Sequence, residues 1–219
     1  MQRRDFSKQL AGAGLGLAMA GLAREATAQG APVEGQHYVR LSTPAPVTLS
    51  SPDKKVEVVE FFWYGCPHCF AFEPVLEAWT RGLAADVAFR RVPAGFTSQY
   101  QVHQRVYYAF EEMNLLATHH RRFFNAIHSQ NMRLNTEAEI AGFMAANGVD
   151  SDKFMATFKS FSVNSKATRA RQLSEAYKID GVPALGIHGR FYTGASLAGS
   201  HEKTVAVADY LIQRARQKA

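Results

Sequence analysis

The chain has 219 residues, 47% hydrophobic and 20% charged, so it is too apolar to be disordered and long enough to bury one sizeable core. Its formal net charge is +6, and the surplus falls to 21 basic against 17 acidic residues once residues 1–28 are set aside. A surplus of this size favours solubility rather than nucleic-acid binding, so we expect no nucleic acid among the partners.

Residues 1–28 have the pattern of a cleaved export signal. Paired arginines, Arg3 and Arg4, precede a mildly apolar stretch over 10–22, and Ala26-Thr27-Ala28 forms a small-x-small cleavage site. We expect cleavage after Ala28 and a periplasmic mature chain over 29–219. The paired arginines and the glycine-rich apolar stretch resemble a twin-arginine signal, although the general secretory route stays open. The stretch is shorter than the ~20 residues that span a bilayer, so we expect no stable membrane insertion.

The mature chain begins with a β-α-β pattern. Weak alternation over 38–41 predicts a short edge strand, and the nearly continuous apolar run 55–62 predicts a strand buried on both faces. Apolar residues then recur at helical spacing from Phe70 to Leu83. The next strand is predicted over 87–93, parallel to the second across a helical crossover.

Helices are predicted for most of the following segment, with an insertion at about 97–165. Thr136 and Glu139 form a capping box that starts one of these helices. The run His119-His120-Arg121-Arg122 is expected to be a solvated first turn. After a long helix that includes 167–177, the chain ends with a β-hairpin of strands 184–188 and 191–193 and a helix over about 201–216.

Cys66 and Cys69 are the two cysteines of the chain, and they lie in the sequence Cys66-Pro67-His68-Cys69 between a predicted strand and helix. This spacing closes a small disulfide ring that a thiolate can reopen. A structural disulfide over so few residues removes little unfolded-state entropy, and a zinc site needs about four ligands in suitable spacing. Redox chemistry is therefore the favoured interpretation, with no metal and no other cofactor.

The residues around Cys66 set the direction of that chemistry. At a helix N-terminus, unpaired N–H groups and the positive end of the macrodipole lower the thiol pKa. His68 adds a hydrogen bond or a positive charge, and Pro67 removes one amide and fixes the turn. A stabilised thiolate stabilises the reduced protein, so the disulfide form is predicted to be a strong oxidant.

The motifs together resemble the DsbA family of periplasmic thiol oxidases. The resemblance is carried by Glu60-Phe61-Phe62 before the cysteine motif, by Phe72-Glu73 after it, and by Gly181-Val182-Pro183-Ala184 before the hairpin. It implies an α/β thioredoxin-like fold with an inserted all-helical subdomain. It also implies newly exported, cysteine-containing substrates and reoxidation by a DsbB-like, quinone-coupled membrane protein.

The resemblance further implies roles for single residues. Cys66 would form the mixed disulfide with substrate, and Cys69 would be the more buried sulfur. Pro183 would be cis and face the cysteines, leaving the Val182 backbone to pair with an extended substrate. Glu60 is a candidate proton relay to Cys69, although an edge-facing or lysine-paired carboxylate stays an alternative. Glu73 is expected to be exposed on its helix, with a modest electrostatic role.

Other functions fit parts of this pattern. A disulfide isomerase usually gains from a dimerisation module, and the sequence has no spare segment for one, so we expect a monomer. A reductase or detoxifying isomerase of the same fold is a second enzyme alternative. A periplasmic chaperone that binds apolar peptides without catalysis is the third.

Overall fold

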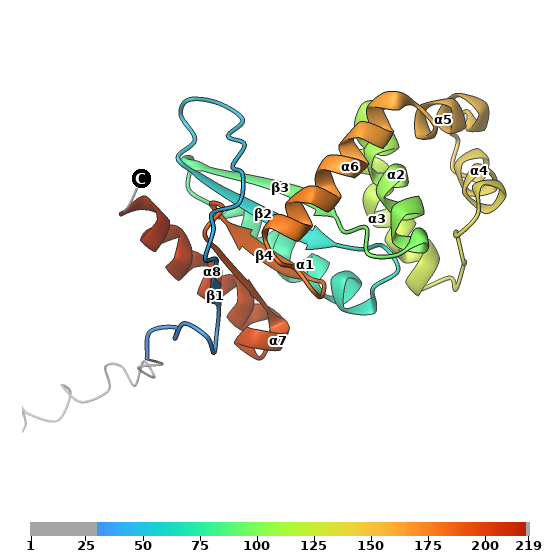
Figure 1. Cartoon of the computed structure of the whole chain (residues 1–219). Helices are drawn as coiled ribbons and strands as arrows, with labels where there is room; N and C mark the ends of the chain where they lie inside the picture. Colours follow the sequence, from blue (N-terminus) through green and yellow to red (C-terminus); the bar gives the residue numbers. More distant parts are fainter. Residues whose placement is uncertain (1–29, 218–219) are drawn as a thin grey trace, which may run out of the picture. The chain divides into compact units, whose positions relative to one another are not determined.

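Five strands form a mixed sheet in the order β1-β5-β4-β2-β3 in the computed structural model, which describes residues 30–217 (Figure 1). The strands are β1 (Val39–Arg40), β2 (Val56–Phe62), β3 (Val87–Pro93), β4 (Ala184–Ile187) and β5 (Phe191–Gly194). β2 pairs in parallel with β3 and antiparallel with β4, and β5 pairs antiparallel with both β4 and β1. The predicted edge strand, βαβ unit and hairpin are confirmed.

β2 lies inside the sheet, and all seven of its residues are buried. Because side chains alternate across a strand, Val58 and Glu60 face one side of the sheet and Val59 and Phe61 face the other. The in-register partner of Glu60 on β3 is Arg91. β2, the strand predicted to be buried on both faces, therefore places the Glu60 carboxyl group on the same side of the sheet as the Arg91 guanidinium of the parallel strand β3.

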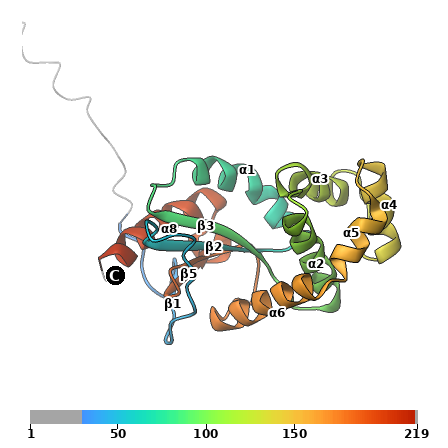
Figure 2. The same ribbon diagram turned by 90° about the horizontal axis from the view of Figure 1, so that it is seen from above.

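Helices cover both faces of this sheet. Figure 2 shows α1 (Pro67–Arg81) on one side and α6 (Phe161–Ala176) on the other. On the α1 side, Val58 packs in one core cluster with Leu76 of α1 and with α8 (His201–Arg216). On the α6 side, Val59 and Phe61 belong to a second cluster that includes Tyr177.

The helices between β3 and β4 extend this second core. They are α2 (Ser98–Glu112), α3 (Leu116–His128), α4 (Glu137–Ala146), α5 (Ser151–Phe158) and α6. Buried phenylalanines fill the space between them, among them Phe110, Phe123, Phe154 and Phe158. The capping box of Thr136 and Glu139 is confirmed at the start of α4. A short helix that the sequence did not predict, α7 (Ala195–Ala198), follows β5.

The expected solvated turn at residues 119–122 is wrong. α3 begins at Leu116, and His119 and His120 are buried inside it, whereas Arg121 and Arg122 are exposed. His120 lies three and four residues before Phe123 and Phe124, so it shares their buried face of the helix.

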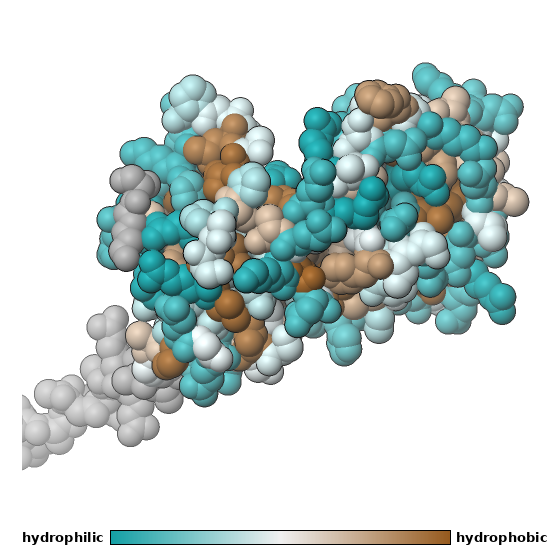
Figure 3. Space-filling model, viewed as in Figure 1, coloured by the Kyte–Doolittle hydropathy of each residue, from teal (hydrophilic) through white to brown (hydrophobic). Residues whose placement is uncertain are grey.

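The surface in Figure 3 is mainly hydrophilic with scattered hydrophobic patches. Large hydrophobic side chains that are exposed within residues 30–217 are Val33, Val47, Leu49, Phe96, Met132 and Phe161. In this part of the chain, we find no helix with the length and apolar composition needed to cross a membrane.

Candidate active site

Cys66 caps the N-terminus of α1. The chain leaves β2 at Phe62 and makes a turn in which the Cys66 N–H donates to the Trp63 carbonyl oxygen at 3.0 Å. Cys66 has extended backbone angles, and its sulfur accepts a hydrogen bond from the Cys69 N–H at 3.4 Å. Pro67 occupies the first turn of α1, where a backbone N–H would have no hydrogen-bond partner within the helix. The expected position of Cys66 at the helix start is confirmed.

The two thiols, which are not bonded to each other here, have opposite electrostatic environments. A hydrogen bond from the Cys69 side chain lowers the pKa of Cys66 to about 6, helped by backbone N–H groups and the charge of His68 and opposed by burial. Burial raises the pKa of Cys69 far above its usual value, and the neighbouring Cys66 and Glu60 add to this. Cys66 is therefore the thiolate near neutral pH, and Cys69 the thiol.

The segment 181–183 faces the Cys66 sulfur. The Val182–Pro183 peptide bond is cis, and the Cys66 sulfur lies 3.4 Å from the Val182 carbonyl oxygen. Within the described chain, the Val182 N–H has no hydrogen-bond partner. The expectations that Pro183 is cis and lies at the cysteines are confirmed.

A cavity of about 340 Å³ adjoins this segment. Its lining includes His68, Val182, Pro183, Tyr192, Leu197 and His201. Pro67 and His68 are both exposed, so they border the solvent side of the cysteine motif. The cavity is mostly apolar with a few polar groups, a combination that suits binding of a peptide segment.

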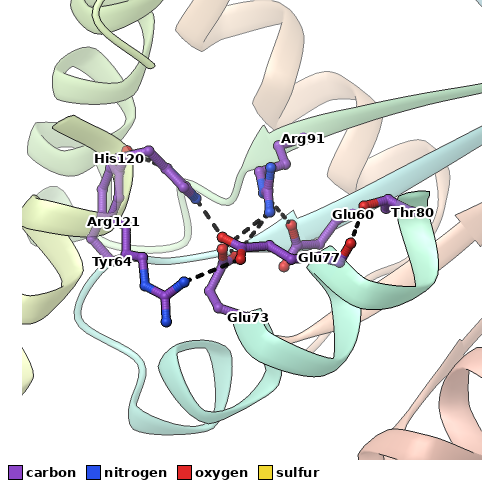
Figure 4. Close-up of polar contacts among 8 residues, drawn as sticks. All are labelled: Glu60, Tyr64, Glu73, Glu77, Thr80, Arg91, His120 and Arg121. Carbon is purple, nitrogen blue, oxygen red and sulfur yellow. Dashed lines mark hydrogen bonds and ion pairs between the residues drawn. The ribbon is translucent and has the colours of Figure 1, made fainter. Parts of the chain in front are cut away.

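A buried charge cluster lies on the face of the sheet that α1 covers. Arg91 donates from Nε to Glu60 Oε2 at 2.9 Å and from Nη2 to Glu73 Oε2 at 3.1 Å, so one guanidinium joins β2, β3 and α1 (Figure 4). Glu60 is fully buried, and its second oxygen, Oε1, has no hydrogen-bond partner within residues 30–217. The carboxylate is thus neither edge-facing nor lysine-paired.

The two carboxyl groups of the cluster differ in their pKa values. Burial raises the pKa of Glu60 to about 8, because the opposing attraction of Arg91 is too weak to offset it and Glu73 repels a second negative charge. Burial acts on Glu73 in the same sense, but the contact with His120 and the hydrogen bonds and charge of Arg91 outweigh it and lower the pKa of Glu73. The cluster therefore holds a proton on Glu60 at neutral pH.

Glu73 is buried, and the expectation that it is exposed is wrong. It lies four residues after Cys69 and three before Leu76, both buried, so it occupies the inner face of α1. Arg91 and His120 were not predicted as part of the site. The pairing of Glu60 with Arg91 depends on strand register, whereas the helical spacing of His120 from Phe123 and Phe124 was a signal in the sequence.

Comparisons with known proteins show the family of the chain. The model of the DSBA-like thioredoxin domain family matches residues 84–201. The thiol:disulfide interchange protein DsbA of Pseudomonas aeruginosa is 41% identical over 203 residues, which cover 93% of this chain and 95% of the relative. The chain belongs to the DsbA family.

Further relatives support the same assignment. The thiol:disulfide interchange protein DsbA of Azotobacter vinelandii is 42% identical over 182 residues, covering 83% of this chain and 84% of the relative. The crystal structure of Pseudomonas aeruginosa DsbA superimposes with a TM-score of 0.78 at 43% identity, covering 84% of this chain and 94% of that one. As a DsbA family member with an intact pair of cysteines, the protein is a thiol:disulfide oxidoreductase with the predicted thioredoxin-like fold.

Proposed function

We propose that this DsbA family member acts as a dithiol oxidase, which donates the Cys66–Cys69 disulfide to proteins with reduced cysteines. The observation that carries the direction is the contrast between the two sulfurs, with the pKa of Cys66 lowered to about 6 and that of Cys69 raised. A thiolate stabilised in the reduced protein favours reduction of its disulfide and makes Cys66 a good leaving group.

The reaction then proceeds by two thiol–disulfide exchanges. A substrate thiolate attacks the Cys66 sulfur, the Cys66–Cys69 bond breaks, and Cys69 leaves with the electron pair. A second substrate thiolate attacks the substrate sulfur of the mixed disulfide and releases the Cys66 thiolate. The substrate has lost two electrons and two protons, and the enzyme is a dithiol.

Glu60 serves this sequence as the proton relay for Cys69. The leaving Cys69 sulfur lies in a buried environment that disfavours its charge, so it takes up a proton as the bond breaks. Glu60 is buried and holds a proton at neutral pH, and once ionised its negative charge raises the pKa of the Cys69 thiol. Reoxidation of the dithiol reverses the proton transfer.

Val182 and Pro183 serve as the substrate-binding segment. The unpaired Val182 N–H and the Val182 carbonyl oxygen, 3.4 Å from the Cys66 sulfur, offer one donor and one acceptor to an extended peptide. The cavity beside them accommodates an apolar side chain of that peptide. His68, exposed next to Cys66, contributes positive charge to the thiolate.

The cellular setting is a proposal from the sequence and the family. The export signal of residues 1–28, with cleavage after Ala28, lies outside the described residues, as does the start of the mature domain at 29. The export signal supports a periplasmic location, where disulfides form and persist. An oxidase left as a dithiol needs an oxidant, and a DsbB-like membrane protein is the partner that family membership supports.

Equilibration with glutathione redox buffers tests the direction of reaction. We expect a reduction potential well above that of cytosolic thioredoxin, about −270 mV. In a Cys69→Ser variant, the Cys66 thiolate should attack a peptide that contains a disulfide, releasing one peptide sulfur as a thiol and leaving a trapped mixed disulfide, whereas Cys66→Ala should trap none. A potential near that of thioredoxin would contradict the oxidase, and a Cys66→Ala variant that keeps full activity would indicate a chaperone.

A further inference from the structure

His120 is a buried polar side chain to which the reaction scheme gives no role. It projects from α3 toward the charge cluster, so it reaches from the inserted helices to residues of α1 and the sheet (Figure 4). Its Nε2 lies 3.5 Å from Glu73 Oε1 and has no closer hydrogen-bond partner among the described residues. A shortening of about 0.5 Å would bring that pair to ordinary hydrogen-bond length.

Tyr64 determines which nitrogen of His120 carries the hydrogen. The Tyr64 hydroxyl lies 2.7 Å from His120 Nδ1. Burial raises the pKa of Tyr64 well above its usual value, so the hydroxyl keeps its hydrogen, and His120 Nδ1 is the one acceptor within its reach among the described residues, so the hydroxyl donates to it. Nδ1 therefore accepts, and Nε2 of the neutral ring carries the N–H that faces Glu73.

The charges of the cluster require one proton to be shared. Arg91 is one cation, whereas Glu60 and Glu73 are two carboxyl groups, and all three lie in or at the edge of the protein interior. Two carboxylates beside one guanidinium leave an excess negative charge, which burial disfavours. One proton on one of the two carboxyl groups balances the cluster.

We propose that His120 is a positioning residue which, by donating its Nε2–H to Glu73, keeps Glu73 ionised and leaves the shared proton on Glu60. Glu73 then receives donors from both Arg91 and His120, whereas Glu60, as far as the described residues go, receives a single donor from Arg91 and has a free oxygen. A carboxyl group with fewer donors is the better place for a proton. The inference deepens the proposed relay, because it explains why Glu60 rather than Glu73 is the acid.

Other groups around His120 leave this assignment unchanged. The titratable or charged side chains that contact it or act on its charge are Tyr64, Glu73, Glu77, Arg91 and Tyr107. Burial lowers the pKa of His120, and the charge of Arg91 acts in the same sense, so the ring is neutral at neutral pH. Glu77 has its own partner in Arg121, at 3.1 Å.

Carboxyl-carbon NMR of the reduced full-length protein, with glutamates labelled with carbon-13, tests the proposal. The Glu60 and Glu73 signals are assigned from Glu60→Gln and Glu73→Gln and followed from pH 5 to 9. In the unmodified protein, nearly all of the titration near pH 8 should appear at Glu60. In His120→Leu, the ratio of protonated Glu60 to protonated Glu73 should fall by about tenfold or more, as expected for loss of one hydrogen bond to a charged group.

His120→Gln is the matched variant, because its amide donates an N–H but does not titrate. This variant should restore the ratio of protonated Glu60 to protonated Glu73 toward its value in the unmodified protein. An unchanged ratio in His120→Leu, or equal shifts in the Leu and Gln variants, would overturn the proposal. Should His120→Leu fail to fold, Tyr64→Phe releases Nδ1 and should move the ratio in the same direction. Nitrogen-15 shifts of the unmodified protein must also show hydrogen on Nε2, and hydrogen on Nδ1 would overturn the proposal.

The failure of this inference is distinguishable from failure of the relay. The partition of the proton is read from the spectra whether or not Glu60 exchanges it with Cys69. A Glu60→Gln variant with unchanged oxidation rates and unchanged pH dependence would contradict the relay alone. A shift of the partition in His120→Leu without any change in rate would place His120 as a positioning residue for a carboxyl pair that catalysis does not use.

Discussion

Strands β2 and β3 carry two buried glutamate–arginine pairs, one on each face of the sheet. Arg90 Nε donates to Glu57 Oε1 at 2.8 Å on the α6 side, and Arg91 Nε donates to Glu60 Oε2 at 2.9 Å on the α1 side. Both carboxylates have no exposed surface. The two pairs thus share residue types, strands, similar distances and fully buried carboxyl groups, whereas Arg90 is more exposed than Arg91.

The pairs differ in what surrounds them. Glu57 also accepts a hydrogen bond from the Thr48 N–H at 3.1 Å, and in the described part of the chain Arg90 forms no ion pair with a second carboxylate. Glu60 accepts from no second donor among the described residues, and it shares Arg91 with Glu73. Burial raises the pKa of Glu60, and the second carboxyl group that shares Arg91 adds to this on the side of the sheet that faces the cysteine helix.

Removal of the shared arginine should have the largest effect. Arg91→Met leaves two buried carboxyl groups without a cation, and we expect a loss of about 3–5 kcal/mol in the free energy of unfolding at pH 7. Arg90→Met should cost less, because Arg90 is more exposed than Arg91 and Glu57 keeps the Thr48 N–H. Urea unfolding of both variants measures the difference, and equal losses would contradict the contrast between the two faces.

The stability of the protein should also respond to pH through Glu60. The pKa of Glu60 is raised in the folded state, so its contribution to stability is present below about pH 4.5 and is lost as pH rises toward 8. Glu60→Gln should therefore gain stability relative to the unmodified protein over this interval, by up to about 1.4 kcal/mol per pH unit.

Glu57→Gln is the matched control for this experiment. Both variants are unfolded with urea in the disulfide form, in which Cys66 does not titrate. A gain of equal size in Glu57→Gln would show that any buried carboxyl group of this sheet has the same effect. No gain in Glu60→Gln would show that Glu60 is ionised throughout.

The exposed pair of Arg121 and Glu77 should have the smallest effect. Its side chains lie at a cavity of about 280 Å³ that His120 and Arg91 also line. Because exposed ion pairs contribute little, Arg121→Ala should change the free energy of unfolding by no more than about 0.5 kcal/mol. The pH dependence of thiol oxidation should not change, and a shift in it would mean that the charge cluster extends to this surface pair.

Local patterns in the sequence predicted most of the fold. The apolar run of β2, the capping box at Thr136 and the helix start at Cys66 each depend on residues close together in the chain, and each is confirmed. The cis Val182–Pro183 bond was predicted from resemblance to the DsbA family. These features need no knowledge of which distant segments meet.

The charge cluster could not be predicted in the same way. Its contacts join Glu60, Glu73, Arg91 and His120 from four elements that come together only in the folded chain. Glu73 was expected to be exposed because a charged residue on a helix usually faces solvent. Its spacing from Cys69 and Leu76 indicated the inner face, but a buried charge becomes acceptable only once Arg91 is known to lie opposite.

Titration of the thiolate absorbance of the reduced protein tests most directly whether Cys66 and Cys69 have opposite electrostatic environments. We expect one thiolate to form with a midpoint near pH 6, to be absent in Cys66→Ser, and Cys69 to remain a thiol well above pH 9. Two thiolates that form together near pH 9 would contradict the proposed origin of the oxidising disulfide.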